Sequence, residues 1–217
     1  MTGLRTDPDF APLLTEPAVQ ETLGIVEHGL GRNGGWFADL SFFTLEYQRR
    51  AANPFGVVSE DEFRGAIDWL ADNIPTLSDA EILLNLDRLL VPLRDGHAYV
   101  CLAPERADLL AALPVAFYRF EEGVFVTQAT ERYADLVGTQ AAEIEGQTMG
   151  EVAQLIVPTI CTDNPQWPTE LVPFRLRETS LLHALGITAR ADRATFRLVD
   201  ADGRQRDHTI VADATAG

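Results

Sequence analysis

Lysine is absent from this chain of 217 residues, in which all 17 basic residues are arginine. Asp and Glu number 33, so the formal net charge is −16 at pH 7. Binding to nucleic acid or to an anionic membrane needs clustered positive charge, and this composition disfavours both. We therefore expect neither nucleic acid nor a membrane as a partner. The absence of lysine also excludes a Ser–Lys catalytic dyad within the chain.

Cysteine is nearly absent as well. Cys101 and Cys161 are the only two, and no Cys-x-x-Cys pair occurs, which argues against a disulfide framework and a zinc site. We expect both thiols to be buried packing residues. No Walker or dinucleotide-binding motif is present. Asp200-Ala-Asp-Gly203 is similar to the start of an EF-hand calcium loop, but the downstream bidentate glutamate of such a loop is missing. The sequence predicts no metal and no cofactor.

Long apolar runs are also missing. No stretch approaches the roughly 20 residues that a membrane-spanning helix needs. The first residues lack the charged-then-apolar order of a signal peptide and contain an early Asp and Pro. These features predict a cytoplasmic protein.

Serine is scarce, which bears on catalysis. The only serines are Ser41, Ser59, Ser78 and Ser180, and none lies in a Gly-x-Ser-x-Gly elbow. Outside His97, the histidines are His28, His183 and His208, far apart in the sequence. We expect these three to be surface or hydrogen-bonded core residues rather than ligands. The chain thus offers no nucleophile constellation of its own.

Apolar residues are plentiful, at 46% of the chain, and the first half has helical periodicity. Thr15 is an expected N-cap. The apolar segment Trp36–Tyr47 predicts a helix ending before Asn53-Pro54, whose aromatic side chains form a core face or, alternatively, line a ligand pocket. Ser59-Glu60-Asp61-Glu62 and Ser78-Asp79-Ala80-Glu81 are capping boxes that begin two further helices. We predict a helical bundle domain over residues 1–103.

The second half of the chain changes to short β-rich runs. Val115–Phe120 and Val124–Thr127 flank a turn with Gly123, which predicts a hairpin. The later elements expected are a short helix over Glu131–Val137, a strand over Ala141–Glu145, a helix over Met149–Val157, a linker over Asp163–Pro173, a helix near Arg175–Leu185, and a terminal hairpin of Thr195–Val199 and His208–Val211. The predicted fold class is α+β, with a second domain over residues 104–217.

Several short motifs, in their order and spacing, resemble the N-terminal half of the tail-specific, or C-terminal-processing, serine peptidases, including the tricorn-core and interphotoreceptor-retinoid-binding-protein branches. The motifs are LLVPLRDGHAYV from Leu89, LPVAFYRFEEGVFV from Leu113, YADLVG from Tyr133, IEG from Ile144 with the following Glu151-Val152, and LLHALG from Leu181. They extend from about Ser59 to Val199. The catalytic domain that follows in this family, with its nucleophile, is not expected in this chain.

The resemblance implies a PDZ-like module in residues 104–217 with an exposed strand edge that accepts an extended peptide. We expect the ligand groove between the Val124–Thr127 strand and the short helix, with lining residues Phe125, Val126, Leu136 and Val137; alternatively, Asp163–Pro173 covers this surface.

The resemblance also implies a role for His97. In the tricorn-like branch, the histidine of this loop is the general base that activates a serine of the catalytic domain. This chain has Gly96 where the tricorn core has a helping serine, and in the lysine-using branch the loop is structural. His97 is therefore either a base that acts with a partner domain or a hydrogen-bonding loop residue.

Three functions remain open. The first is the non-catalytic substrate-recognition and scaffold half of a tail-specific-protease-like protein, which binds an extended peptide or a partner catalytic domain. The second is a stand-alone peptide- or protein-binding unit. The third is a repurposed scaffold that binds or transforms an apolar small molecule, as a biosynthetic enzyme or carrier. We favour the first, and we predict no proteolysis by this chain alone.

Overall fold

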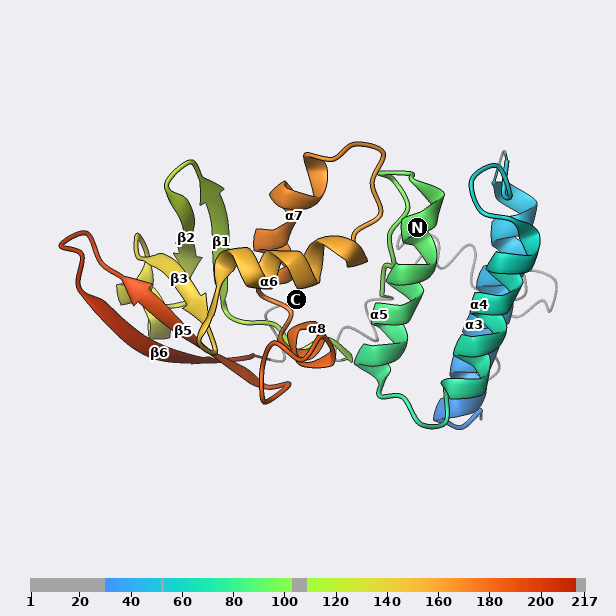
Figure 1. Ribbon diagram of the computed structural model, residues 1–217. Coiled ribbons are helices and arrows are strands. Elements are labelled where there is room, and N and C mark those ends of the chain that lie inside the picture. Colours follow the sequence, from blue (N-terminus) through green and yellow to red (C-terminus); the bar gives the residue numbers. More distant parts are fainter. Residues whose placement is uncertain (1–29, 52, 103–108, 214–217) are drawn as a thin grey trace, which may run out of the picture. The chain divides into compact units, whose positions relative to one another are not determined.

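The computed structural model describes residues 30–51, 53–102 and 109–213 of a mixed α+β protein (Figure 1). Contacts divide the chain into two compact units, Met1–Thr76 and Leu77–Gly217. Within the described ranges, no helix combines the length and apolarity needed to cross a membrane. The helix predicted to begin at Thr15 lies outside the described residues.

The first unit contains the helices α3 (Arg32–Arg50) and α4 (Glu60–Asn73). Trp36 and Leu40 of α3 are buried. The rings of Phe43, Tyr47 and Phe55 surround that of Phe63, and the Tyr47 and Phe63 centroids are 4.9 Å apart. The aromatic segment of α3 therefore contributes to a core, as predicted, because aromatic rings bury large apolar areas.

Both predicted capping boxes are present. The hydroxyl of Ser59 accepts a hydrogen bond from the backbone N–H of Glu62, whose carboxylate accepts one from the Ser59 backbone N–H. Ser78 and Glu81 do the same at the start of α5 (Asp79–Leu90). The contact division falls between α4 and α5, whereas the sequence-based boundary at residue 103 counts both helices in one bundle.

The second unit is built on a six-stranded antiparallel sheet with the order β1-β2-β3-β5-β6, to which β4 is added by pairing with β3. The strands are β1 (Val115–Phe120), β2 (Gly123–Ala129), β3 (Gln140–Ile144), β4 (Gln147–Thr148), β5 (Arg193–Val199) and β6 (Gln205–Val211). Both predicted hairpins, β1–β2 and β5–β6, are confirmed. Gly123 has a φ of 142° in the first turn, and a Cβ there would lie 2.3 Å from the Gln140 side chain, so the turn requires glycine.

Helices cover one face of this sheet. They are α6 (Met149–Ile156), α7 (Trp167–Arg175), α8 (Thr179–Ala184) and the 3-10 helices η4 (Glu131–Leu136) and η5 (Val157–Thr159). In Figure 1, α6, α7 and α8 lie beside the sheet, and α5 packs against α8 and η5. Phe117 and Phe196 pack together in the core with ring centroids 5.2 Å apart. Side chains of Val152, Ile156 and Val172 close this core from the helical side.

The predicted linker Asp163–Pro173 is wrong, because most of it forms α7. Its three prolines suggested a linker, but Pro168 lies in the first turn of α7, where a missing N–H costs little. The side chain of Asn164 accepts hydrogen bonds from the backbone N–H groups of Gln166 and Trp167, the N-cap and the first residue of the helix. The helix predicted near Arg175–Leu185 is confirmed only over α8 (Thr179–Ala184), because Arg175 is the last residue of α7 and the backbone of Glu178 is not helical.

The expectation of an exposed edge at the Val124–Thr127 strand is also wrong. β2 pairs with β1 on one side and, through Val124 and Phe125, with β3 on the other. Further along, Val126 exchanges backbone hydrogen bonds with Gly138 and Thr139. The strands at the two ends of the main strand order are β1 and β6, and α7 packs against β1.

Candidate functional site

The predicted catalytic-type residue, His97, lies in a tight loop after α5. The chain leaves α5 through the 3-10 helix η2 (Val91–Leu93), and Arg94 then takes a left-handed conformation with a φ of 52°. The Asp95 carboxylate accepts a hydrogen bond from the His97 backbone N–H at 2.9 Å, and the His97 Nδ1 lies 3.4 Å from the same oxygen. Because the imidazole is 96% exposed, its Nε2 edge is open to a partner.

All four serines already have structural hydrogen bonds. Ser59 and Ser78 cap helices, and the Ser41 hydroxyl donates to the Phe37 carbonyl within α3. The Ser180 hydroxyl accepts from the backbone N–H of Ala111 and is buried. The structure thus brings no serine to His97.

The residues predicted to form the ligand groove are only partly brought together. Phe125 and Val137 line a hollow of about 410 Å³ together with Phe120, Thr127 and Gly138, whereas Val126 borders it but has its side chain buried in the core. The rings of Phe120 and Phe125 meet edge to face with centroids 5.7 Å apart. Leu136, at the end of the short helix η4, is packed in the core with 0% exposure. Its predicted role in the groove is therefore wrong.

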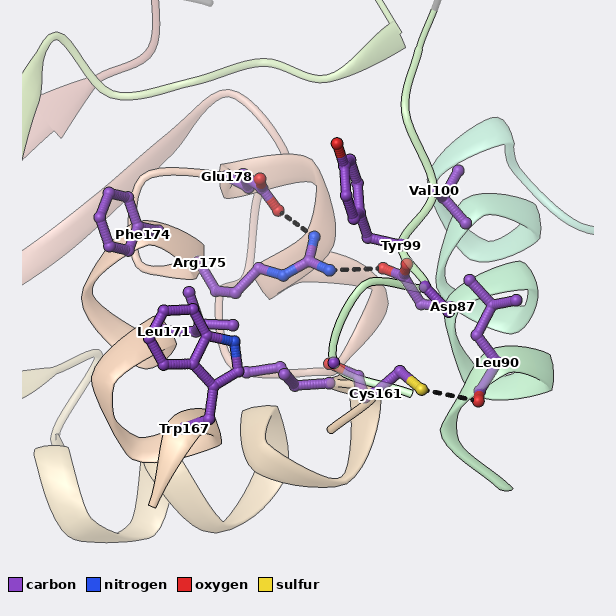
Figure 2. A pocket seen from close by; sticks show the side chains of 14 residues that line it. Asp87, Leu90, Tyr99, Val100, Cys161, Trp167, Leu171, Phe174, Arg175 and Glu178 are labelled. Carbon is purple, nitrogen blue, oxygen red and sulfur yellow. Dashed lines mark hydrogen bonds and ion pairs between the residues drawn. The ribbon is translucent and has the colours of Figure 1, made fainter. Parts of the chain in front are cut away.

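A deeper cavity, of about 360 Å³, lies between α5, the His97 loop and α7 (Figure 2). Its polar centre is the guanidinium of Arg175. One guanidinium nitrogen donates to the carboxylate of Asp87 at 2.8 Å and another donates to the carboxylate of Glu178 at 2.9 Å. Figure 2 shows the guanidinium between these two carboxylates. A second cavity, of about 350 Å³, is lined by the same three residues and by apolar side chains such as Leu83 and Leu181.

Burial changes the electrostatics of this centre. Loss of water raises the pKa of Asp87 to about 6, although the guanidinium of Arg175 and the backbone N–H of Val100 act in the opposite direction. The two carboxylates raise the pKa of Arg175 above its usual value. In formal charge, the cluster sets two carboxylates around one guanidinium.

The two cysteines differ, contrary to the expectation that both are buried. Cys161 is buried beside the cavity, its thiol donates to the Leu90 carbonyl at 2.9 Å, and burial raises its pKa. Cys101 is exposed and lines the second cavity. Within the described ranges, no group of three or more His, Cys, Asp or Glu side chains is placed to hold a metal ion.

Sequence reasoning missed the Asp87–Arg175–Glu178 cluster. Asp87 is the one acidic position on the apolar face of α5, between Leu83, Leu84 and Leu90, and this interruption of the pattern was the available signal. Arg175 and Glu178 lie within the helix predicted near Arg175–Leu185, three residues apart, but no pattern in the sequence related them to Asp87.

Comparisons with known proteins give a match in structure only. No protein-family profile matches the sequence, and no curated protein matches it. CPAF, a chlamydial serine protease that resembles tail-specific proteases, matches in its mature form with lactacystin at a TM-score of 0.55 and 16% identity, over 82% of this chain and 34% of CPAF. A CPAF mutant matches at a TM-score of 0.54 and 15% identity, over 82% of this chain and 33% of CPAF. The chain therefore has a fold similar to part of CPAF and spans about a third of its length.

Proposed function

We propose that this chain is the non-catalytic recognition and scaffold portion of a tail-specific-protease-like protein. The observation that carries the proposal is the similarity in fold between this chain and a third of CPAF, in a chain whose serines all have structural hydrogen bonds. Acyl transfer needs a nucleophile, a base and an oxyanion hole within hydrogen-bond reach of one another. Of these three groups, this chain offers a candidate only for the base, which is His97. Catalysis therefore requires a further domain that supplies the nucleophile and the oxyanion hole.

The groove next to β2 is the proposed peptide site within a PDZ-like module. Since β2 has partners on both sides, a ligand does not extend the sheet there. It lies instead across the side chains of Phe120, Phe125 and Val137, which offer exposed apolar surface. Apolar side chains of an extended peptide would fill this hollow, while rim residues such as Glu122 and Thr127 remain hydrated.

A titration with short peptides that carry apolar C-terminal residues tests this site. We expect backbone amide shifts confined to residues 120–127 and 137–138. The dissociation constant should be on the order of 1 mM or lower, which corresponds to weak binding. Phe125→Asp should abolish the shifts, because it places a charge in the apolar hollow. Leu155→Asp, on an exposed part of α6 outside the groove, is the matched control. Shifts that are absent, or that survive Phe125→Asp, would contradict the peptide site.

A separate assay tests the scaffold role. The pure chain should not cleave an unstructured protein substrate, and it should become part of an active peptidase only when a catalytic domain is supplied. Cleavage by the pure chain that is blocked by a serine-directed inhibitor would show that a nucleophile had been overlooked.

A further inference from the structure

The cavity centred on Arg175 has features that neither folding nor the proposed peptide site requires. Its volume of about 360 Å³ is at the lower end of the range of small-molecule sites. It lies within the unit Leu77–Gly217 and shares no lining residue with the groove at Phe125. It can therefore be tested independently of the proposed function.

Three aromatic residues line this cavity yet remain largely open to solvent. Tyr99 is 71% exposed, Phe174 is 63% exposed and Trp167 is 46% exposed. In the view of Figure 2, the ring of Tyr99 lies above the guanidinium of Arg175 and that of Trp167 lies below it. Large apolar side chains that cluster in the open around a hollow are typical of binding sites.

The charges around the cavity favour a cation. Asp87 and Glu178 together outweigh Arg175 by one negative charge. A further carboxylate, that of Asp163, lies next to Gly96, which lines the cavity: a Cβ added at Gly96 would come within 3.2 Å of its Oδ1. An anion is disfavoured, because two of the guanidinium nitrogens already donate to carboxylates and a bound anion would have to displace them.

We propose that this cavity binds a small organic cation, an amine or quaternary ammonium with an apolar body. The ammonium lies near Glu178 and Asp87, where the unbalanced negative charge is found. The aromatic faces of Tyr99 and Trp167 add the attraction between a cation and a π-system, which is strongest for indole. The apolar body of the ligand packs against Leu171 and Phe174.

Three compounds that differ in charge but share a phenyl group test the proposal: phenethylammonium, 2-phenylethanol and phenylacetate. Calorimetric titration of the full chain at pH 7 and low salt should give an affinity for the ammonium at least tenfold higher than for the alcohol, and no measurable binding of phenylacetate. Equal affinities for the three compounds, or tighter binding of phenylacetate, would overturn the proposal.

Variants locate the site. Glu178→Gln keeps a hydrogen-bonding group for Arg175 but removes one negative charge, and it should weaken binding of the ammonium about tenfold. Trp167→Leu should weaken it to a similar extent, and because this ring is half exposed the variant should fold even if Glu178→Gln does not. The matched control is Glu170→Gln, a carboxylate of α7 that pairs with Arg119 outside the cavity. Unchanged affinity in folded Trp167→Leu, or equal losses in Glu170→Gln, would refute the assigned site.

Discussion

Asp87 keeps its carboxylate almost out of water, with a side-chain exposure of 7%, on a helix whose neighbouring positions are apolar. Desolvation raises its pKa from 3.8 to about 6, despite the bond to Arg175. The folded state therefore binds a proton at Asp87 more tightly than the unfolded state does. The resulting stabilisation is fully present below pH 3.8 and is lost as the pH rises through about 6.

Asp87→Asn should therefore change the pH dependence of stability. A difference of about 2 pKa units corresponds to about 3 kcal/mol. Between pH 4 and pH 7, the free energy of unfolding of the wild type should therefore fall, relative to that of the variant, by up to this amount. Urea unfolding across this range measures the difference. The variant Asp72→Asn, at an exposed position of α4, controls for a change in net charge. A wild-type profile parallel to that of Asp87→Asn would show that Asp87 does not titrate in this range.

His97→Ala separates the two roles of this residue. Since the imidazole is almost fully exposed, the free energy of unfolding should change by less than about 0.5 kcal/mol. Activity of a complex reconstituted with a catalytic domain should fall by orders of magnitude, on the scale of losing a member of a catalytic triad. Unfolding of the variant, or undiminished activity, would return His97 to a structural role.

At the scale of elements, the capping boxes are the most direct link between sequence and stability. Ser78→Ala removes the side-chain acceptor for the Glu81 backbone N–H and should destabilise the second unit by about 1 kcal/mol. Ser41→Ala is the matched control, because the Ser41 hydroxyl bonds within the middle of α3, where alanine is the better helix former. Chemical denaturation should therefore show a loss for Ser78→Ala and no loss for Ser41→Ala.

Elements with a local signal were predictable from the sequence. Capping boxes and hairpin turns are encoded within a few residues, and α4, α5 and both hairpins follow from them. A third capping box, Thr148 with Glu151, begins α6 and could have been read in the same way. By contrast, α7 was hidden because it contains two prolines: Pro168 lies in the first turn, where proline is tolerated, but Pro173 lies inside the helix, where proline is normally disfavoured. The β3–β5 pairing joins segments about 50 residues apart, which no local pattern indicates.

The candidate sites show the same limit. The hollow at Phe125 and Val137 follows from neighbouring elements of the sheet. The Arg175 cluster does not, because it joins Asp87 to residues 88 and 91 positions further along the chain. No spacing rule links such positions. Only the charge placed among the leucines of α5 indicated that a partner had to come from elsewhere.

At the scale of the whole molecule, the core of the sheet lies entirely within Leu77–Gly217. A fragment of residues 77–217 should therefore fold by itself, with a cooperative unfolding transition and the dispersed amide spectrum of the sheet retained. Spectra of the fragment and of the full chain provide the comparison. A fragment that binds hydrophobic dye and unfolds without cooperativity would show that the first unit is needed for folding.

The unequal exposure of the two thiols gives the molecule a built-in reporter position. A maleimide dye should couple to Cys101 and leave Cys161 unmodified in the native state, because the second thiol is buried and bonded to Leu90. The dye would then be attached to a residue that lines the second cavity, next to Arg175. Fluorescence from a single attached probe would follow ligand entry in real time, without any cysteine being added or removed.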